Sequence, residues 1–176
     1  MTKPILRGFA PIANRNAEVL ILGSMPGNAS LAAGRYYAHP QNAFWPVMAA
    51  LLQIDVGLPY RDRTQALKTV HIALWDVLQS CTRDGSLDAM IDRDAERAND
   101  FAGFFRDHQK VTRVFFNGAK AEACFKRHVL PTIGAAPIRY ARLPSTSPAN
   151  ASIPFERKLA AWQIILAPGE SLSGTR

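Results

Sequence analysis

A nearly continuous apolar run at residues 17–23, with the sequence AEVLILG, restricts the fold of this chain more than any other feature. A run of this kind that ends at a glycine is typical of a strand buried on both faces. Such strands occur in parallel sheets, because helices cover both faces of those sheets. The run therefore predicts an α/β protein with a parallel sheet at its centre.

Further strand-like and amphipathic segments alternate along the rest of the chain. We predict additional strands in the first half of 70–78, at 111–116 and at 138–143. Helices are predicted at 43–53, 61–69, 87–108, 119–130 and 154–166. The segment 87–108 would form one long surface helix, or two with a bend near Gly103. This order predicts a three-layer α/β/α sandwich around a mostly parallel, four-stranded sheet.

The length of the chain limits the number of domains. A chain of 176 residues, 48% of them hydrophobic, can bury one substantial core but is short for two ordinary domains. We therefore expect a single domain over 1–176, with an N-terminal extension at 1–16 and a frayed tail at 168–176.

Charge and cysteine content narrow the classes of partner. The 21 Lys and Arg against 14 Asp and Glu give a net charge of +7, which favours a polyanionic partner. Cys81 and Cys124 are far apart, and no histidine has the spacing of a metal ligand, so we expect no disulfide, metal or cofactor. The sequence has no signal-peptide core and no apolar stretch of membrane-spanning length, so we expect a cytoplasmic protein that does not bind membranes. We also expect a monomer.

The site is expected at the carboxyl ends of the strands, where ligands of open α/β sheets bind. The loop after the first strand begins with Gly23, Ser24, Met25, Pro26 and Gly27. This turn lacks the lysine of a phosphate-binding loop and the full GxGxxG pattern, so a nucleotide cofactor is disfavoured. It is not a GxSxG nucleophile elbow either, which disfavours a serine hydrolase.

The second half of that loop, YYAHPQNAFW at 36–45, is richer in chemistry. Aromatic rings and amide or imidazole groups this close together suit a flat heteroaromatic ligand. The alternative is that Phe44 and Trp45 are core residues of the following helix and that Asn42 only caps it. We favour the core assignment for Phe44 and Trp45, and the ligand assignment for Tyr37 and Asn42. His39 could bind a phosphate or base, or stabilise the loop.

GSMPG followed by YYAHPQNAFW resembles the first motif of the mismatch-specific and hypoxanthine-DNA glycosylase branches of the uracil-DNA glycosylase superfamily. LPSTSPANAS at 143–152 lies where that superfamily has its second motif, a loop that enters the DNA minor groove. The segment WD…RDGSLD at 75–88 also resembles the hypoxanthine branch. The resemblance implies an α/β/α fold and excision of a deaminated base from double- or single-stranded DNA.

The resemblance also assigns roles to residues. It implies that Tyr37 stacks on the flipped base and that Asn42 is catalytic. The other base-binding candidates are Gly23, Ser24, Met25, Pro26, Gly27, His39, Phe44 and Asn117. The DNA-binding candidates are Ser145, Ser147, Pro148, Ala149 and Asn150. Without the first motif, this second segment would be interpreted as a surface turn with a helix cap.

Met25 distinguishes the hypoxanthine-DNA glycosylase branch from the mismatch-specific uracil branch. Mismatch-specific uracil enzymes have an asparagine at this position, and a thioether can neither orient nor activate water. Hypoxanthine is therefore the preferred substrate, with uracil or mismatched thymine as the alternative and a non-catalytic nucleic-acid or nucleotide-binding module as another. Neither motif contains a lysine, which disfavours a lyase step.

Charged residues outside the motifs have simpler explanations. Asp84 or Ser86 would cap the helix predicted from residue 87, Asp88 has no expected role in the site, and Asp76 could lie near the site. Five basic residues could contact phosphates, although each alone is an ordinary solvated charge: Lys120, Arg139, Arg142, Arg157 and Lys158.

Overall fold

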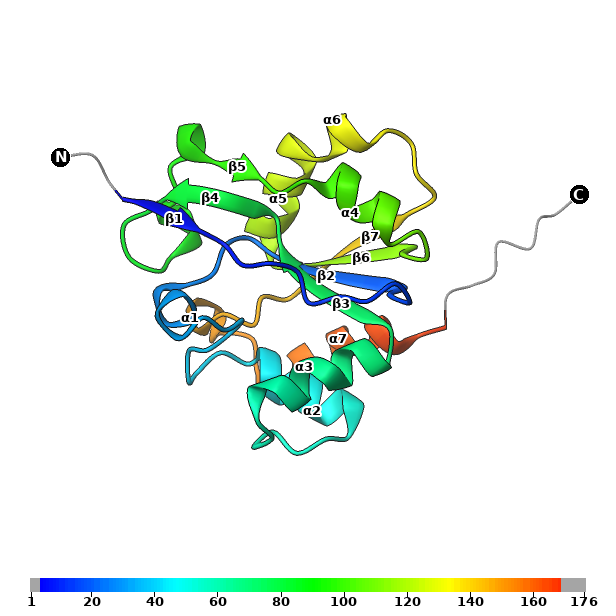
Figure 1. Ribbon diagram of the computed structural model, residues 1–176. Helices are drawn as coiled ribbons and strands as arrows, with labels where there is room; N and C mark the ends of the chain where they lie inside the picture. Colours follow the sequence, from blue (N-terminus) through cyan, green and yellow to red (C-terminus); the bar gives the residue numbers. More distant parts are fainter. Residues whose placement is uncertain (1–3, 169–176) are drawn as a thin grey trace, which may run out of the picture.

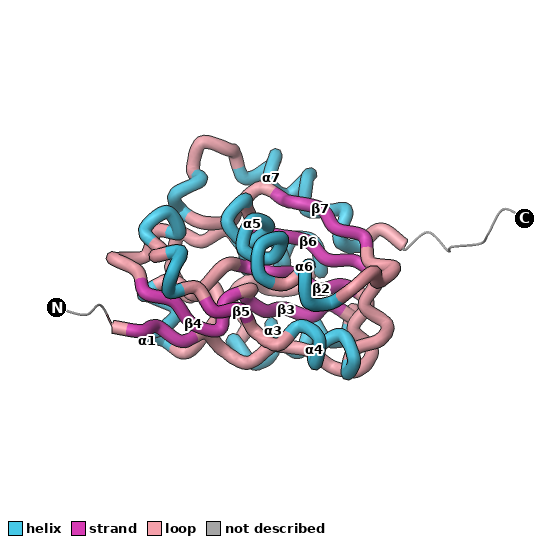
Figure 2. Tube along the Cα trace, turned by 90° about the horizontal axis from the view of Figure 1, so that it is seen from above, coloured by secondary structure: helices cyan, strands magenta, loops and turns pink. Residues whose placement is uncertain are grey.

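The computed structural model describes residues 4–168, and its centre is the predicted parallel sheet. The strands β2 (Val19–Gly23), β3 (Ile72–Asp76), β6 (Arg113–Asn117) and β7 (Arg139–Leu143) form a four-stranded sheet in the order β3-β2-β6-β7. All three pairings are parallel, and Figure 2 shows the strands side by side. Every residue of β2 and β3 is buried, which confirms the prediction made from the first apolar run.

Helices cover both faces of this sheet, so the three-layer prediction is confirmed (Figure 1). On one side lie α2 (Phe44–Leu52), α3 (Tyr60–Thr69) and α7 (Phe155–Trp162). On the other lie α4 (Phe101–Asp107), α5 (Ala119–His128) and α6 (Leu130–Ile133). Large side chains such as Phe44, Phe116 and Trp162 are fully buried between these layers.

A second, antiparallel sheet was not predicted. It contains β1 (Ile5–Arg7), β4 (Leu78–Thr82) and β5 (Arg97–Ala98) in the order β1-β4-β5. Residues 4–16 are therefore integrated with the rest of the chain, and Ile12 forms a further bridge with Leu74 of the main sheet. Most of the predicted tail, 169–176, lies outside the described residues.

The prediction of helix over most of 87–108 is wrong. Only α4 is an α-helix there, and before it the chain forms two short 3-10 turns, η1 (Asp88–Met90) and η2 (Arg93–Ala95), and strand β5. Asp100 caps α4, because its Oδ1 accepts a hydrogen bond from the Gly103 amide at 2.9 Å. Gly103 therefore lies in the first turn of a short helix and not at a bend.

The remaining elements are short. The loop predicted after β2 contains the helix α1 (Asn28–Ala33), and the second-motif segment contains a 3-10 turn, η3 (Pro148–Asn150). A last 3-10 turn, η4 (Gln163–Leu166), continues α7. Cys81 and Cys124 are free and buried. Across residues 4–168, no helix is both long and apolar enough to cross a membrane.

Candidate active site

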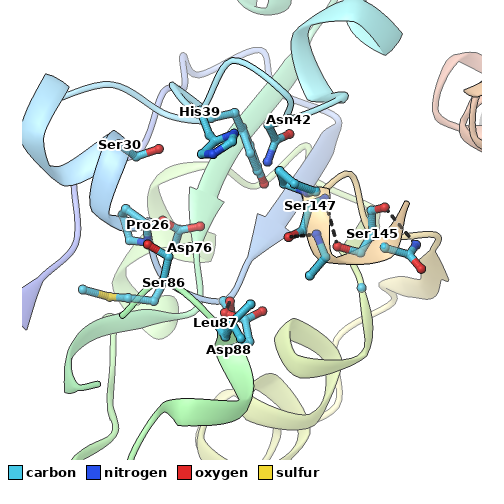
Figure 3. A pocket seen from close by; sticks show the side chains of 18 of the residues that line it. Pro26, Ser30, His39, Asn42, Asp76, Ser86, Leu87, Asp88, Ser145 and Ser147 are labelled. Atoms are coloured by element: carbon cyan, nitrogen blue, oxygen red, sulfur yellow. Dashed lines mark hydrogen bonds between the residues drawn. The ribbon is translucent and has the colours of Figure 1, made fainter. Parts of the chain in front are cut away.

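A cavity of about 930 Å³ opens at the carboxyl ends of the central strands. Its size is within the range of small-molecule pockets and leaves room for an extruded nucleotide. Twelve of the predicted site residues line it: Ser24, Met25, Pro26, Gly27, Tyr37, His39, Asn42, Ser145, Ser147, Pro148, Ala149 and Asn150. The fold thus brings both motifs to one space, as Figure 3 shows for several of them.

Three predicted base-binding residues, Gly23, Phe44 and Asn117, lie behind the cavity wall instead of on it. Phe44 is fully buried and its ring stacks on Tyr37, with the ring centroids 4.1 Å apart. The Asn117 side chain donates a hydrogen bond to the Tyr37 hydroxyl at 3.1 Å. Gly23 leaves space for the side chains of Asp76 and Tyr37. Their support for the wall is therefore indirect, and direct contact of these three residues with a base stays a prediction.

The Tyr37 ring is held in place before any ligand arrives. Its backbone has φ of 54°, a left-handed conformation that costs energy for an aromatic residue. Stacking on Phe44 and the hydrogen bond from Asn117 fix the ring from two sides. Such a ring can stack on a flat base without first losing rotamer entropy.

The Asn42 amide is oriented by the start of α2. Its Oδ1 accepts a hydrogen bond from the Phe44 backbone amide at 2.9 Å, and its side chain lines the cavity. The N-cap of α2 is Ala43, so the prediction that Asn42 caps this helix is corrected. Figure 3 shows the side chain of Asn42 at the cavity beside His39. Because a carbonyl oxygen has two lone pairs, Oδ1 can still accept from a water, and Nδ2 remains a donor.

His39 is exposed at the same edge of the cavity. Its Nδ1 accepts a hydrogen bond from the Gln41 amide at 3.1 Å. This bond assigns the proton of a neutral imidazole to Nε2, which can then donate to a phosphate or base.

The GSMPG turn is tied to the segment that follows β4. Arg83 is buried, and its guanidinium donates to the Pro26 carbonyl at 2.7 Å and to the Gly85 carbonyl at 2.8 Å. The Ser86 hydroxyl accepts from the Asn28 amide at 3.1 Å, so Ser86 is not a cap for a helix from residue 87. These bonds keep 83–88 against the first motif.

Two carboxyl groups reach the cavity through this arrangement. Asp88, which we expected outside the site, lines the cavity and accepts a hydrogen bond from the Ser24 hydroxyl at 2.6 Å. Burial raises the pKa of Asp88, and the hydrogen bond from Ser24 partly offsets this effect. Asp76 lines the cavity at the end of β3 and is 3% exposed. Both residues lie in the WD…RDGSLD pattern, but only the fold shows that they line the same cavity.

The second-motif loop forms another wall of the cavity and is anchored by Thr146. Sequence reasoning missed this residue, which is 1% exposed. Its amide donates to Asn117 Oδ1 and its hydroxyl accepts from Asn117 Nδ2, each at 2.9 Å. Its carbonyl accepts from the Ala43 amide at 2.9 Å. Thr146 therefore joins the two motifs through β6 and the start of α2.

The predicted phosphate-binding basic residues separate into two groups. Arg142 lines the cavity, and Arg139 and Arg157 are exposed. Lys120 forms an ion pair with buried Glu96, and Lys158 is 5% exposed. The expectation of phosphate contacts is therefore corrected for these two lysines, because one is engaged by a carboxylate and the other is buried. Within 4–168, no group of three or more His, Cys, Asp or Glu residues could hold a metal ion.

Comparisons with known proteins identify the family of this chain. A family model described as the uracil DNA glycosylase superfamily matches residues 10–166. A hypoxanthine DNA glycosylase from Methanosarcina barkeri is 38% identical over 116 residues, which is 65% of this chain and 72% of the relative. One of the same name from Methanosarcina acetivorans is 36% identical over 118 residues, or 66% of this chain and 73% of the relative.

A solved structure shares the fold. The solution NMR structure of a candidate uracil DNA glycosylase from Methanosarcina acetivorans superposes with a TM-score of 0.75 at 31% sequence identity. The match covers 92% of this chain and 99% of that one. The similarity therefore extends over nearly the whole chain.

Proposed function

This chain belongs to the uracil DNA glycosylase superfamily, and we propose that it is a monofunctional DNA glycosylase that releases hypoxanthine from deoxyinosine in DNA. The observation that carries the proposal is the single cavity shared by the Tyr37 ring, the Asn42 amide and the second-motif loop. The two relatives named for hypoxanthine support this choice of base. The reaction belongs to base excision repair, and we place it in the cytoplasm, carried out by a monomer on double- or single-stranded DNA.

The base leaves the DNA stack before the reaction. Extrusion costs a few kcal/mol and is easiest for a mispaired base such as hypoxanthine. The extruded base stacks on Tyr37, and the Ser24–Gly27 turn contacts its edge. Because Phe44 and Asn117 already hold the Tyr37 ring, the stacking energy is not spent on ordering it.

Asn42 positions the water that attacks the sugar. The free lone pair of Oδ1 accepts a hydrogen bond from this water, and the amide orientation is set by the Phe44 N–H. A neutral amide contributes orientation more than basicity, as suits a transition state with cationic character at the sugar.

The second-motif loop contacts the DNA strand. Ser145 and Ser147 contact the flanking phosphates, and Pro148, Ala149 or Asn150 enters the gap left by the base. Internal bonds shape this loop, since Asn150 Nδ2 donates to the Ser145 carbonyl at 3.0 Å and the Ser147 hydroxyl accepts from the Ala149 amide at 3.2 Å. Asn117 and Thr146 connect the loop to the base site.

The nucleophile is water and not an amine. None of the residues that line the cavity within 4–168 is a lysine. A lyase reaction needs an amine that forms a Schiff base with the sugar, so the expected product is an intact abasic site.

Uracil is the second candidate substrate, because the similar solved structure carries the name of a uracil enzyme. Met25 lies at the cavity but is 6% exposed, and its thioether supplies no strong hydrogen bond to a uracil or to a water. The side chain at this position therefore favours hypoxanthine.

Duplex oligonucleotides with one deoxyinosine, one deoxyuridine or one G:T mismatch test the function. Purified protein is incubated with each, and abasic sites are cleaved with alkali. We expect the deoxyinosine strand to be cut fastest, and only after alkali. Faster cutting of the deoxyuridine strand would transfer the assignment to uracil. Binding without an abasic product from any substrate would support the binding module.

Replacing Asn42 tests its role. Asn42→Ala should lower the single-turnover rate on deoxyinosine by about 100- to 1,000-fold, comparable to the loss of an oriented polar group in other active sites. Gln41→Ala removes the neighbouring, exposed amide and should stay within about twofold of wild type. An Asn42→Ala rate within a few-fold of wild type contradicts the assignment.

A further inference from the structure

Asp76 is buried in the cavity wall without the partners that buried acids normally have. It lies at the carboxyl end of β3 and is 3% exposed. Its Oδ2 is buried and has no hydrogen-bond partner within residues 4–168. Figure 3 shows its carboxyl group at the cavity, across from Ser145 and Ser147. An unpaired polar atom in such a place is costly, unless a ligand completes it.

The position of this carboxyl group is set by the main sheet. Asp76 pairs with Gly23 on β2, and a Cβ at Gly23 would lie 2.3 Å from Asp76 Oδ1 and 3.0 Å from the Tyr37 hydroxyl. Any side chain at Gly23 would therefore displace the acid. The Asp76 carbonyl accepts from Asn99 Nδ2 at 2.8 Å, which holds the backbone from the other side.

A role in stabilising the fold does not explain this acid. The charge of Arg83 acts on Asp76, but the hydrogen bonds of this guanidinium go to the carbonyls of Pro26 and Gly85 and to Asn28 Oδ1. Asp88 lies on the same side of the cavity, and its charge opposes ionisation of Asp76. The carboxyl group thus lines the cavity with one buried oxygen unpartnered and a second carboxyl group nearby, an arrangement more common in active sites than in supporting structure.

We propose that Asp76 is a second catalytic residue, a neutral carboxylic acid that donates its proton to the departing base. The inference rests on the proposed glycosylase function. An extruded nucleotide keeps its sugar at the mouth of the cavity, where the DNA strand continues, so a deeply buried group meets the far edge of the base. In hypoxanthine that edge carries O6 and N1–H, which match the O–H and C=O of a carboxylic acid.

The proposed reaction cleaves the glycosidic bond and returns the protein to its starting state. The bond between sugar C1′ and base N9 breaks, and its electron pair goes to the base. The Asp76 proton moves to O6 of the base, which later becomes the keto form in water. The oxygen of the water held by Asn42 bonds to C1′, and one of its protons passes through solvent to the Asp76 carboxylate. The products are an abasic site and neutral hypoxanthine, and both side chains are restored.

The charged and titratable groups around Asp76 favour its protonated form. Burial first, and then the charge of Asp88, raise the pKa of Asp76 to about 8, against the opposing charge of Arg83. The hydroxyls of Tyr36, Tyr37 and Tyr60 also interact with it electrostatically, and burial raises the pKa of each, so they stay neutral. Asp76 therefore holds a proton at neutral pH, as a general acid must.

Asp76→Asn keeps the shape and a hydrogen-bond donor but cannot transfer a proton. We expect its single-turnover rate on deoxyinosine to fall about 100-fold or more, the range for loss of a general acid. Binding of a duplex with an uncleavable abasic analogue should stay within about threefold of wild type. The matched control Asp62→Asn removes an exposed acid in the first turn of α3, and its rate should be unchanged.

The pH profile separates a proton donor from a merely structural residue. With subsaturating enzyme, the wild-type rate should decline tenfold per pH unit above about pH 8, because the acid loses its proton there. Asp76→Asn should lack this decline. A variant rate within threefold of wild type with the same profile would overturn the proposal.

An unfolded variant and an inactive wild type have different consequences for the proposal. If Asp76→Asn does not fold, the wild-type profile alone decides, and a flat rate from pH 7 to pH 9.5 overturns the proposal. If wild-type protein releases no base from any substrate, the proposed function fails, and that failure is visible before any variant is made.

Discussion

Two buried carboxyl groups, Asp76 and Glu96, show how one chain treats the same chemical group in opposite ways. Asp76 is 3% exposed and Glu96 is 2% exposed, so both side chains are shielded from solvent. Glu96 meets three basic side chains, Lys120, Arg127 and His128, all from α5. Asp76 meets no cation that bonds it within residues 4–168, and its Oδ2 has no partner there.

The difference lies in what surrounds each acid and is expressed in its pKa. Burial acts to raise the pKa of Glu96, but hydrogen bonds from Lys120 and His128 and the charges of Lys120 and Arg127 lower it overall. For Asp76, burial and the charge of Asp88 act together. Burial by itself therefore does not identify a site acid. A buried acid that lines a cavity and has an unpartnered oxygen is a better candidate.

Glu96→Gln tests the structural half of this comparison and should have the largest effect on stability. It leaves three basic groups without their charge partner, so we expect a loss of about 2–4 kcal/mol in the free energy of unfolding. The estimate is at the lower end because the basic groups are partly exposed. Urea unfolding monitored by circular dichroism measures it.

The matched control is Glu122→Gln on α5, an acid whose ion pairs with Lys126 and Arg142 are more exposed. It should cost less than about 1 kcal/mol. Equal losses for Glu96→Gln and Glu122→Gln would show that burial of Glu96 contributes nothing to the strength of its contacts.

The pH dependence of stability should have opposite signs for the two acids. The folded-state pKa of Asp76 is raised, so its contribution is fully present below the unfolded value of 3.8 and is lost as pH rises toward about 8. The wild type should lose at most about 1.4 kcal/mol per pH unit relative to Asp76→Asn between pH 5 and pH 8. The folded-state pKa of Glu96 is lowered, so its contribution is present above 4.5 and is lost below that pH.

Unfolding free energies of wild type, Asp76→Asn and Glu96→Gln over pH 3.5–8.5 measure both slopes. Asp76→Asn and wild type that keep a constant difference from pH 5 to pH 8 would mean that Asp76 is charged throughout. The contrast between the two acids would then disappear.

Lys120→Gln should have a small effect and decides whether this residue contacts phosphate, as the sequence predicts, or supports Glu96, as the structure shows. Because Lys120 pairs with Glu96, we expect a loss of about 1 kcal/mol in stability and DNA affinity within about twofold of wild type. Arg142→Gln, at the cavity, should weaken DNA binding more and reduce its salt dependence. Fluorescence anisotropy at two salt concentrations measures both. A larger affinity loss for Lys120→Gln would restore the predicted phosphate contact.

Local patterns predicted most of the central architecture. The buried run at 17–23, the strand at 111–116 and the helix at 119–130 agree with β2, β6 and α5 within a few residues. The helix predicted for 87–108 is mostly absent, because contacts with distant parts of the chain outweigh the helical periodicity of this segment. Asp88 bonds Ser24, Glu96 bonds α5 and β5 pairs with β4, so the part of this segment before α4 forms 3-10 turns and a short strand instead of an α-helix.

The candidate site also contains residues that the sequence predicts and residues that only the fold identifies. Tyr37, Asn42 and the loop at 145–150 could be proposed from sequence because each lies in a short contiguous motif with distinctive chemistry. Thr146, Asp88 and the importance of Asp76 could not. A hydroxyl or carboxyl group acquires its role from neighbours distant in sequence, such as Asn117 for Thr146 and Ser24 for Asp88.

Sequence alone was enough for the parallel sheet, the order of its strands and helices along the chain, and the two motifs at its carboxyl edge, because hydrophobic periodicity and motif chemistry are local properties. The tertiary structure decided which buried acid is paired with basic side chains and which lines the cavity with an unpartnered oxygen. Solvation and charge act through space, and so the protonation of Asp76 depends on Asp88, Arg83 and burial under distant segments.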